Sequence, residues 1–503
     1  MKKILLSALT LLSLLALVAC GDKTKNEEPP IKTELGAYIK ENTSFEVVGN
    51  GHTLPQSYEG ETITYTHEGD ILTDYTIPFS YQRRDVTYDV KAEVKVGDET
   101  ITEDLRFLIK ASPYVYKLNI TTEGKEEVVS KEVYLKGTIQ VDSDDAFKTE
   151  EIEMEIRGRG NSTWANPKKP YRIKMKERTS ILGLRAVKNY VLLAEYTDKS
   201  LLRNYAAHTL ASYLNLGYKL DMRFVEVYFN GRYDGLYFMT EQIKEDKNGL
   251  DLDISGATDS GFLVELEADD RIGSEGPENV GWVRVYDNNF VIKDPDLTDY
   301  EDSVSSDKAT YIKGYLEKTF DSFNTDEFDK YIDLDSFIDY FVLQELFKNV
   351  DVGYSSVYSY KDTNGLLFMG PVWDFDISLG NGDYFHSAYD LYRNRYNTWF
   401  DRIVNQKRFE NLYIKRFKEV MDLYLPLLLE EIDFAYEGIK EAANRNFERW
   451  PIMGDYVWPN PEEMVNIKTH KGQVDYIKTY LNKRSTWLIN EMQTKGYYDY
   501  IPQ

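Results

Sequence analysis

The stretch from Asp335 to Asp376 constrains the fold of this chain most, because it sets the order of a helix, a loop and a hairpin. Residues 335–349 (DSFIDYFVLQELFKN) form a helical run that leads to Asp351. Two short β-like runs follow, SSVYSYKD and LLFMGPVW, joined across residues 363–365 (TNG). The second run leads directly into residues 373–376 (WDFD). The sequence therefore predicts one carboxylate after a helix and a second acidic group after the next hairpin.

This order of elements is typical of the phosphoryl-transfer site of protein kinases. There, a helix delivers a catalytic Asp onto a loop, and a hairpin then carries a metal-binding Asp in an Asp-Phe-Gly turn. One carboxylate accepts or orients the attacking hydroxyl, and the other holds the magnesium that bridges the nucleotide phosphates. A helix cap followed by an acidic loop, in a chain of net charge −25, is the alternative interpretation.

A basic turn lies upstream, between two predicted strands. Residues 151–156 (EIEMEI) run into a turn with Gly158 and Gly160, and the strand YRIKM follows the loop. A glycine-containing turn lets backbone N–H groups approach phosphates, and a lysine on the next strand can pair with them. Lys174 in YRIKM takes the position of that kinase lysine. A solvated basic strand edge is the alternative. The candidate phosphate-binding residues are Arg157, Gly158, Arg159, Gly160, Asn161 and Lys174.

Four longer motifs together resemble one known family. They are RGRGNSTWANPKKPYRIKM, LLRNYAAHTL, YFNGRYDGLYFMTEQI and MGPVWDFDISLGN. The sequence that contains them resembles the spore-coat protein H (CotH) kinase family, atypical protein-kinase-like enzymes of the bacterial surface and spore coat. The resemblance covers about residues 115–495.

The resemblance implies ATP-dependent phosphoryl transfer to Ser or Thr of a protein substrate. It implies that Asp351 is the catalytic carboxylate and that Asp374 binds Mg²⁺ or Mn²⁺. Two departures from the kinase pattern stand out: no His-Arg precedes Asp351, and Ser356 occupies the position of the second metal-binding Asn. Asp376 replaces the Gly of Asp-Phe-Gly and could supply that ligand. Glu241 and Gln242, at the end of the strand LYFMTEQI, are candidates near the adenine, or simply a strand end.

The N-terminus predicts secretion. Residues 1–19 have a short basic start and an apolar run over 4–18, as in a signal peptide. Cys20, the single cysteine, resembles the acylated cysteine of a bacterial lipobox; an incidental cysteine in a discarded signal is the alternative. Residues 20–33 are then a lipidated cysteine and a flexible tether. The predicted location is extracytoplasmic, with the protein anchored to the cell membrane by lipid.

The predicted fold class is α+β. Residues 34–112 are short alternating runs typical of a small immunoglobulin-like β-sandwich, either a spacer or a substrate- or wall-binding domain. Residues 113–497 form a CotH-type, kinase-like domain with a β-rich N-lobe and a helical C-lobe. Residues 244–300 are predicted to be a β-rich insertion between the lobes. Helical runs are predicted over 305–348, 407–447 and 461–494.

Composition narrows the partners and the chemistry. The charge of −25 argues against nucleic acid; it fits a basic protein substrate, or simply solubility. Five histidines without an H-E-x-x-H motif, and no Gly-x-Ser-x-Gly, argue against a zinc hydrolase or a serine hydrolase. Two alternatives to a kinase stay open. Many carboxylates, 40 tyrosines and seven tryptophans also suit a glycosidase, although the basic turn is then unexplained. The other is a kinase-like surface adhesin without activity.

Overall fold

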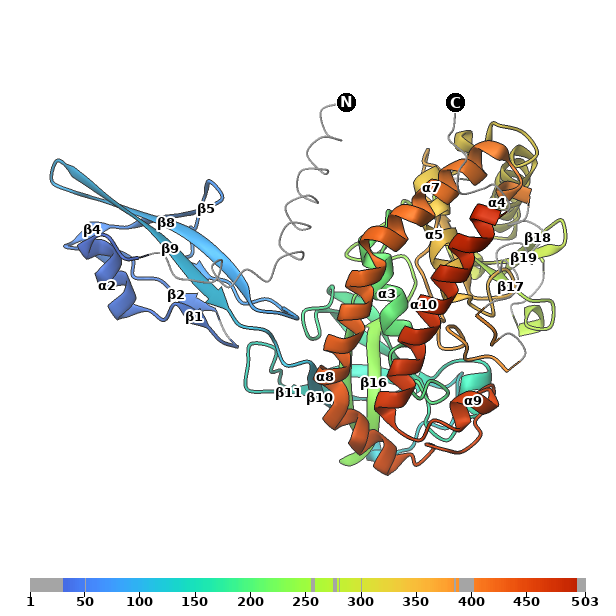
Figure 1. Cartoon of the computed structure of the whole chain (residues 1–503), viewed down its shortest axis with the longest axis horizontal. Helices are drawn as coiled ribbons and strands as arrows, with labels where there is room; N and C mark the ends of the chain where they lie inside the picture. The colour runs from blue at the N-terminus through green and yellow to red at the C-terminus, as the bar shows by residue number, and fades with distance from the viewer. Residues whose placement is uncertain are drawn as a thin grey trace. The chain divides into compact units, whose positions relative to one another are not determined.

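The computed structural model describes residues 30–49, 51–254, 258–274, 278–279, 281–299, 301–383, 386–388 and 402–494. The chain divides into two compact units (Figure 1). The first contains the residues up to Pro113 together with Ser143–Lys148, and the second contains Tyr114–Asp142 and everything from Thr149 onward. The predicted signal peptide and Cys20 lie outside the described residues. In the described part of the chain, no helix is both long enough and apolar enough to cross a membrane.

The first unit is built on a five-stranded sheet in the order β1-β9-β8-β5-β6. Its two long strands, β8 (Val86–Val96) and β9 (Glu99–Ile109), pair along their whole length. The shorter strands of this sheet are β1 (Glu46–Val47), β5 (Thr64–His67) and β6 (Asp70–Ile71). Two separate two-stranded ribbons are also present. One pairs β2 (His52–Thr53) with β7 (Thr76–Ile77), and the other pairs β3 (Ser57–Tyr58) with β4 (Glu61–Thr62). One sheet, two ribbons and a helix therefore stand where the sequence predicted a sandwich of strands.

That helix, α2 (Glu34–Asn42), was not predicted from the sequence. Thr33 caps it by accepting the N–H of Gly36 at 3.1 Å. The carboxylate of Glu103, on β9, in turn accepts the N–H of Thr33 at 2.8 Å and its hydroxyl at 2.6 Å. The capping threonine thus takes its own partner from a residue 70 positions away, which a local pattern does not reveal.

The second unit contains a closed seven-stranded barrel in the order β10-β11-β12-β13-β14-β16-β15. Its strands are β10 (Val115–Thr122), β11 (Leu135–Asp142), β12 (Ile152–Gly158), β13 (Tyr171–Thr179), β14 (Val187–Leu193), β15 (Met222–Phe229) and β16 (Arg232–Glu241). Parallel pairing of β10 with β15 closes it, from Val115↔Phe224 to Ile120↔Phe229. Barrel closure removes exposed strand edges. The mixed α+β class is thereby confirmed, and the closed barrel is an addition that the sequence did not predict.

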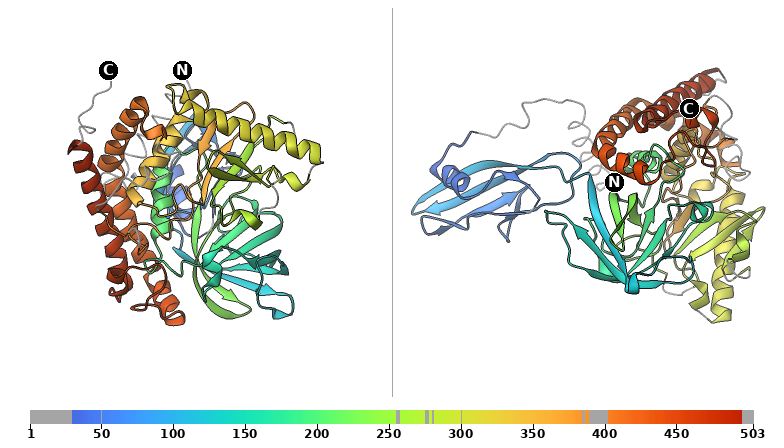
Figure 2. Two further views of the ribbon diagram at one scale, coloured as in Figure 1. Left: turned by 90° about the vertical axis from the view of Figure 1, so that its right-hand side faces the viewer. Right: turned by 90° about the horizontal axis from the view of Figure 1, so that it is seen from below.

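The predicted insertion is part of a second sheet, ordered β18-β19-β17-β20-β21. Within it, β17 (Phe262–Glu267) pairs with β20 (Val357–Lys361), and β20 pairs with β21 (Leu367–Met369) to form the predicted hairpin. On its other side β17 pairs with β19 (Asn288–Asp294), which in turn pairs with the edge strand β18 (Trp282–Val285). In the left view of Figure 2 the yellow-green strands of this insertion lie beside the orange hairpin. Residues near 265 and near 357 are therefore neighbours by hydrogen bonding.

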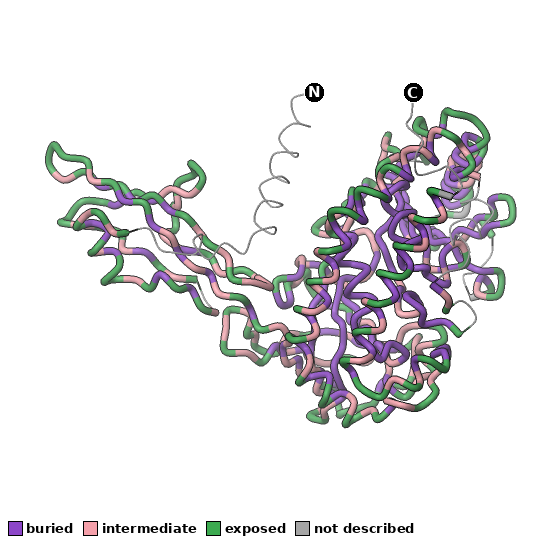
Figure 3. The backbone as a smooth tube through the Cα atoms, in the orientation of Figure 1, coloured by how far each residue is buried: buried purple, intermediate pink, exposed green. Residues whose placement is uncertain are grey.

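Helices complete the second unit. They are α3 (Arg203–Tyr213), α4 (Asp302–Ser322), α5 (Leu334–Phe347), α7 (Lys407–Leu423), α8 (Leu425–Arg449), α9 (Glu462–Val465) and α10 (His470–Thr494). The long predicted helical runs are thus each broken into shorter helices. Helix α8 packs on β16 and on α3, and α10 packs on α8. The tube along α3, α5 and β16 is largely purple in Figure 3, so these elements form the core behind the candidate site.

Candidate active site

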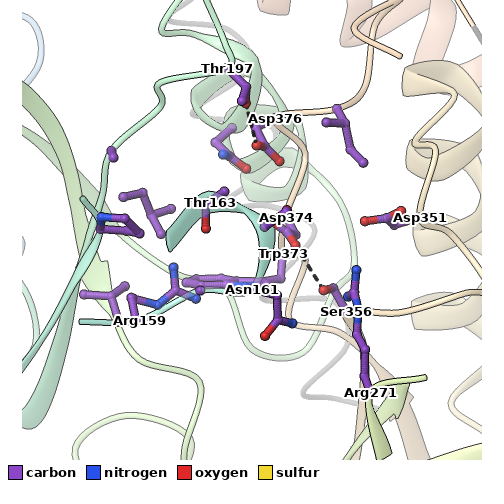
Figure 4. Close-up of a pocket in the computed structure, with 18 of the residues that line it drawn as sticks. Arg159, Asn161, Thr163, Thr197, Arg271, Asp351, Ser356, Trp373, Asp374 and Asp376 are labelled. Carbon is purple, nitrogen blue, oxygen red and sulfur yellow. Dashed lines mark hydrogen bonds between the residues drawn. The ribbon is translucent and has the colours of Figure 1, made fainter. Parts of the chain in front are cut away.

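A cavity of about 1270 Å³ lies in the second unit, lined by the barrel, the second sheet and the loops after α5 and β21. Its charged lining residues have both signs. The cationic ones are Lys131, Arg157, Arg159, Arg172, Arg271 and Lys293, and the acidic ones are Glu132, Glu195, Glu265, Glu267, Asp351, Asp374 and Asp376. Figure 4 shows Arg159 on one side, Asp351 on the other, and Asp374 and Asp376 between them. The structure therefore brings both predicted carboxylate segments and the basic turn to one cavity.

Asp351 is positioned by the turn that ends α5. The helix stops at Phe347, because Lys348 takes a left-handed conformation with φ of 46°. The backbone N–H of Asp351 donates to the amide oxygen of Asn349 at 3.2 Å. Its carbonyl accepts the N–H groups of Tyr354 at 2.8 Å and Ser355 at 3.1 Å. The helix thus ends two residues before the end of the predicted run 335–349, and a hydrogen-bonded turn carries Asp351 to the cavity.

Asp374 has a hydroxyl partner from the hairpin. Ser356 donates its hydroxyl to Oδ2 of Asp374 at 3.0 Å, drawn as a dashed line in Figure 4. Both residues have positive φ, 62° for Asp374 and 58° for Ser356. Such backbone conformations cost free energy in residues other than glycine and gather at functional sites. Ser356, which departs from the kinase pattern, is here the direct partner of the candidate metal-binding carboxylate.

Asp376 lies deeper on the same loop. Thr197 donates its hydroxyl to Oδ2 of Asp376 at 3.0 Å. Burial, followed by the charges of Asp374 and Asp351, raises the pKa of Asp376 well above its usual range, although the Thr197 hydrogen bond opposes the rise. A cation near these oxygens would favour the charged form of Asp376.

Sequence reasoning missed Glu195, which also lines this cavity. Its side chain is buried, and burial, together with the charges of Asp198 and Asp376, raises its pKa well above the usual value. The amide nitrogen of Asn204, on α3, donates to both oxygens of Glu195, at 3.0 and 3.2 Å. The amide oxygen of Asn204 accepts the N–H of Phe375 at 2.8 Å. The signal was one acidic residue inside the apolar run YVLLAEY, just before a helix.

Three arginines form the basic side of the cavity. The guanidinium of Arg159 stacks 5.3 Å from the Trp373 ring centre, as Figure 4 shows. Arg157 donates Nη1 to the carbonyl of Lys131. Burial, together with the charges of Arg157 and Arg159, lowers the pKa of Arg172. Mutually repelling guanidinium groups in one cavity favour the binding of an anion.

The glycine turn contributes less backbone to this cavity than its sequence suggested. The N–H of Gly158 donates to the Ser130 carbonyl at 2.8 Å, and that of Arg159 to the Pro170 carbonyl at 3.2 Å. A side chain at position 158 would also collide with the Trp164 ring, which lies 2.3 Å from where its Cβ would stand. Gly158 is therefore needed for packing. Gly160, with φ of 87°, and Asn161 follow at the cavity wall.

Two predicted site residues, Lys174 and Glu241, do not line the cavity. Lys174 is 52% exposed and lies 3.6 Å from the carboxylate of Glu155. Strand β14 also separates its strand, β13, from helix α3, so Lys174 is not on the strand that precedes the helix. Glu241 is buried against Arg185, at 3.0 Å, and accepts a hydrogen bond from the Tyr218 hydroxyl. Arg172, two residues earlier and on the same face of β13, lines the cavity instead.

A protein-family model described as CotH kinase protein matches residues 156–488. The chain belongs to this family. The match confirms the resemblance read from the four motifs, and a kinase-like function follows at this coarse level. A search of curated proteins finds no match. All of the cavity residues from Arg157 to Pro459 lie within the matched range.

The donor chemistry of this CotH-family cavity fits a hard divalent cation. Asp374 and Asp376 both present carboxylates to it, and the pKa of Asp376 is raised by burial first and then by the neighbouring charge of Asp374. Across the described ranges, no group of three or more His, Cys, Asp or Glu side chains is arranged to hold a metal ion. A magnesium ion is commonly held by one or two carboxylates, with water and substrate phosphates supplying the other ligands. The residues present therefore suit a metal that binds together with a nucleotide.

Proposed function

We propose that this protein is an atypical protein kinase that transfers the γ-phosphoryl group of ATP to Ser or Thr of a surface or secreted protein. One observation carries the proposal. Asp351 and Asp374 line the same cavity as a cluster of arginines, which gives an acidic side for metal and acceptor and a basic side for phosphates. Membership of the CotH kinase family supports the same chemistry.

The chain's own residues have distinct roles in this proposal. Arg159, Arg172 and the turn at Gly160 and Asn161 bind the phosphates. Asp351 orients the acceptor hydroxyl and takes its proton. The acceptor oxygen then forms a bond to the γ-phosphorus as the bond from that phosphorus to the bridging oxygen breaks, and ADP leaves with the electron pair.

Asp374, held by Ser356, and Asp376, held by Thr197, would bind the metal. A bound Mg²⁺ or Mn²⁺ would supply positive charge that neutralises the phosphate oxygens. Asn204, whose amide nitrogen donates to Glu195, accepts the N–H of Phe375 and so fixes the residue between those two aspartates. This arrangement replaces the Asn of the kinase catalytic loop with a second carboxylate on the metal-binding loop.

The hypothesis that the protein is a glycosidase has less support from this site. Glycoside hydrolysis needs two carboxyl groups and no cluster of cations. The basic wall formed by Arg157, Arg159 and Arg172 has no role in that reaction, whereas phosphate binding uses it. We therefore treat sugar release, and ATP-independent surface binding by an inactive protein, as outcomes that would contradict the proposal.

We also propose that the protein is tethered outside the cytoplasmic membrane. The support is the basic and apolar N-terminus with a single cysteine at position 20. The acceptor would then be another protein of the cell envelope or the spore coat, and the acidic charge of the chain would favour a basic one.

The decisive experiment is a phosphotransfer assay with the purified protein. ATP labelled at the γ-phosphate is incubated with Mg²⁺ or Mn²⁺ and with casein and histone as acceptor proteins. We expect label on Ser or Thr with the parent protein and none above background with Asp351→Asn. The proposed function would be contradicted if no metal-dependent transfer occurred to casein, to histone or to the protein itself. Sugar release from polysaccharides in the same preparation would then favour a glycosidase.

A further inference from the structure

The segment after β17 brings an arginine to the acidic side of the cavity. Nη1 of Arg271 donates to the hydroxyl of Ser355 at 2.8 Å and lies 3.4 Å from a carboxylate oxygen of Glu267. The Arg271 guanidinium also lies 5.8 Å from the ring centre of Tyr354. Tyr354 and Ser355 are the two residues whose N–H groups bind the Asp351 carbonyl. Arg271 is thus attached to the turn that positions Asp351.

The same guanidinium is close to both candidate catalytic carboxylates. Burial by itself lowers the pKa of Arg271. The negative charges of Glu267, Asp351 and Asp374 raise it by more, so the pKa of Arg271 lies above its usual value. Figure 4 shows its side chain extending past Ser356 toward Asp351. The side chain is 28% exposed and lines the cavity, so a bound molecule can reach it.

Phosphoryl transfer needs positive charge at this place. The transferring group must lie between an acceptor at Asp351 and a metal at Asp374. Charge spreads over its three equatorial oxygens in the transition state. A guanidinium offers planar, paired N–H donors that match phosphoryl oxygens and keeps its charge at any physiological pH. Arg159 lies on the opposite side of the cavity from Asp351 in Figure 4, and Arg172 belongs to β13 of the barrel.

We propose that Arg271 is a catalytic residue that donates hydrogen bonds to the equatorial oxygens of the transferring phosphoryl group. This role rests on the proposed kinase function. As the acceptor oxygen bonds to phosphorus and ADP departs, Arg271 stabilises the charge on the oxygens that stay with the phosphorus. The acceptor proton still goes to Asp351.

A merely structural role for Arg271 makes different predictions. Its contacts with Glu267, Ser355 and Tyr354 would then only stabilise the segment, and its loss would lower thermal stability. Arg284 is a matched control. It lies on β18, in the sheet that contains β17, and its side chain is 43% exposed. It binds Asp269 at 3.0 Å and does not line the cavity.

The test compares Arg271→Ala, Arg271→Lys and Arg284→Ala with the parent protein and with Asp351→Asn. The measurements are kcat with casein or with the protein itself as acceptor, ATP affinity by calorimetry, and melting temperature. Arg271→Ala should lower kcat roughly 10²- to 10³-fold, as loss of one transition-state donor does. ATP affinity and melting temperature should stay close to those of the parent. Added guanidinium ion should restore part of the kcat of Arg271→Ala and none of that of Asp351→Asn.

Three outcomes overturn the inference. An active parent with Arg271→Ala within a few-fold of its kcat refutes the role of Arg271 and leaves the kinase function intact. Arg271 has only a structural role if three results occur together. The loss of activity in Arg271→Ala follows a fall in melting temperature, Arg271→Lys has full activity, and added guanidinium does not rescue Arg271→Ala. A parent without phosphotransfer refutes both this inference and the proposed function.

Discussion

At the residue scale, the backbone at the cavity is unusual in three places. Glu195, Ser356 and Asp374 have φ of 50°, 58° and 62°, a left-handed region that side chains other than glycine rarely adopt. Each such residue costs on the order of 1–3 kcal/mol. The cost is offset by fixed partners, because Asn204 holds Glu195 and Ser356 holds Asp374. Strain held at three acidic or hydroxyl residues around one cavity supports a functional role for the cavity.

The two carboxylates to which we assign catalytic and metal-binding roles, Asp351 and Asp374, should be distinguishable by substitution. Asp351→Asn keeps the side-chain shape but removes the charge, so phosphotransfer should fall by orders of magnitude while ATP affinity in Mg²⁺ stays within a few-fold of the parent. Asp374→Asn should weaken that affinity, because the metal would bridge protein and phosphates. Calorimetric titration with ATP, with and without Mg²⁺, measures the difference. If Asp351→Asn abolished binding and Asp374→Asn did not, the two assignments would have to be exchanged.

Two cations on the same strand provide a matched pair. Arg172 lines the cavity, whereas Lys174, two residues further along β13, is exposed beside Glu155. We expect Arg172→Ala to lose roughly tenfold or more in ATP affinity, in line with about 1.5–3 kcal/mol for a hydrogen bond to a charged group. Lys174→Ala should bind ATP as the parent does. Equal losses in both variants would show that Lys174 reaches the phosphates after all.

At the scale of elements, helix α3 controls the loop that carries Asp374 and Asp376. Arg203 donates Nε to the Ser378 carbonyl at 2.8 Å and pairs with Asp198, both fully buried. Asn204, the next residue, accepts the N–H of Phe375 at 2.8 Å. In a protein kinase, the corresponding helix offers a glutamate to a lysine. In this chain α3 instead binds backbone groups of the loop that carries Asp374 and Asp376.

Removing the Asn204 side chain should weaken metal binding more than it destabilises the fold. Asn204→Ala leaves the Phe375 N–H and the Glu195 carboxylate without this partner. We expect metal-dependent ATP affinity to fall about 10- to 100-fold, as for other residues that orient metal ligands. The free energy of unfolding should fall by about 1–3 kcal/mol. The control is Ser212→Ala on the same helix, where the hydroxyl only donates to the Thr209 carbonyl. If both variants lowered the affinity equally, general weakening of α3 would explain the result.

At the scale of the whole molecule, a buried lysine joins the barrel to the helices. Lys168 is 1% exposed and donates to the carbonyl of Leu236 on β16 and, at 2.9 Å, to the amide oxygen of Asn446 on α8. Its amino group also lies 4.4 Å from the Tyr237 ring centre. Burial lowers the pKa of Lys168 to about 7. The interface between sheet and helix therefore contains a group that titrates near neutral pH.

Stability should depend on pH through Lys168. Between the folded pKa of about 7 and the ordinary value of 10.5, the unfolded chain binds a proton that the folded chain does not. Raising the pH through this window therefore stabilises the folded state, and this gain is absent below about pH 7. From pH 7 to 9.5 the difference between parent and Lys168→Met should change in favour of the parent by up to about 3 kcal/mol, at about 1.36 kcal/mol per unit.

Urea unfolding followed by tryptophan fluorescence measures this difference. All seven tryptophans follow residue 113, so the signal reports the second unit. A conservative control is Lys169→Met, since the neighbouring Lys169 is only partly buried and donates to the Trp164 carbonyl at 2.7 Å. A difference between parent and Lys168→Met that stays constant with pH would contradict the lowered pKa.

Attachment to a membrane is the other prediction for the whole protein. Cys20→Ala should move the protein from the membrane fraction to the soluble fraction, because the acyl chains would have no attachment atom. Fractionation followed by detection of the protein measures this. Ser7→Ala, in the same predicted signal, serves as a control that should leave the protein in the membrane fraction. A Cys20→Ala variant that still pelleted after a high-salt wash would contradict the lipid anchor.

Much of the local structure around Asp351 and Asp374 was predictable from sequence. The turn residues 363–365 and the alternating runs on either side predicted the β20–β21 hairpin, and the pattern of residues 335–349 predicted α5. Long ordered motifs placed the chain in its family, which the family match confirms. These features depend on neighbours in sequence, so the sequence alone carries them.

The exact partners in the cavity depended on long-range pairing. Lys174 and Arg172 share one short strand, and only the closed barrel decides which of them meets the cavity. Glu195 and Asn204 became visible as a pair only when α3 was placed against residue 375. Arg271 lies 80 residues before Asp351 and approaches it because β17 pairs with β20. The sequence by itself determined the family, the helix and hairpin, and the two aspartates. The tertiary structure decided which cations and which buried acid join them, because strand register and helix packing are set by residues far apart in the chain.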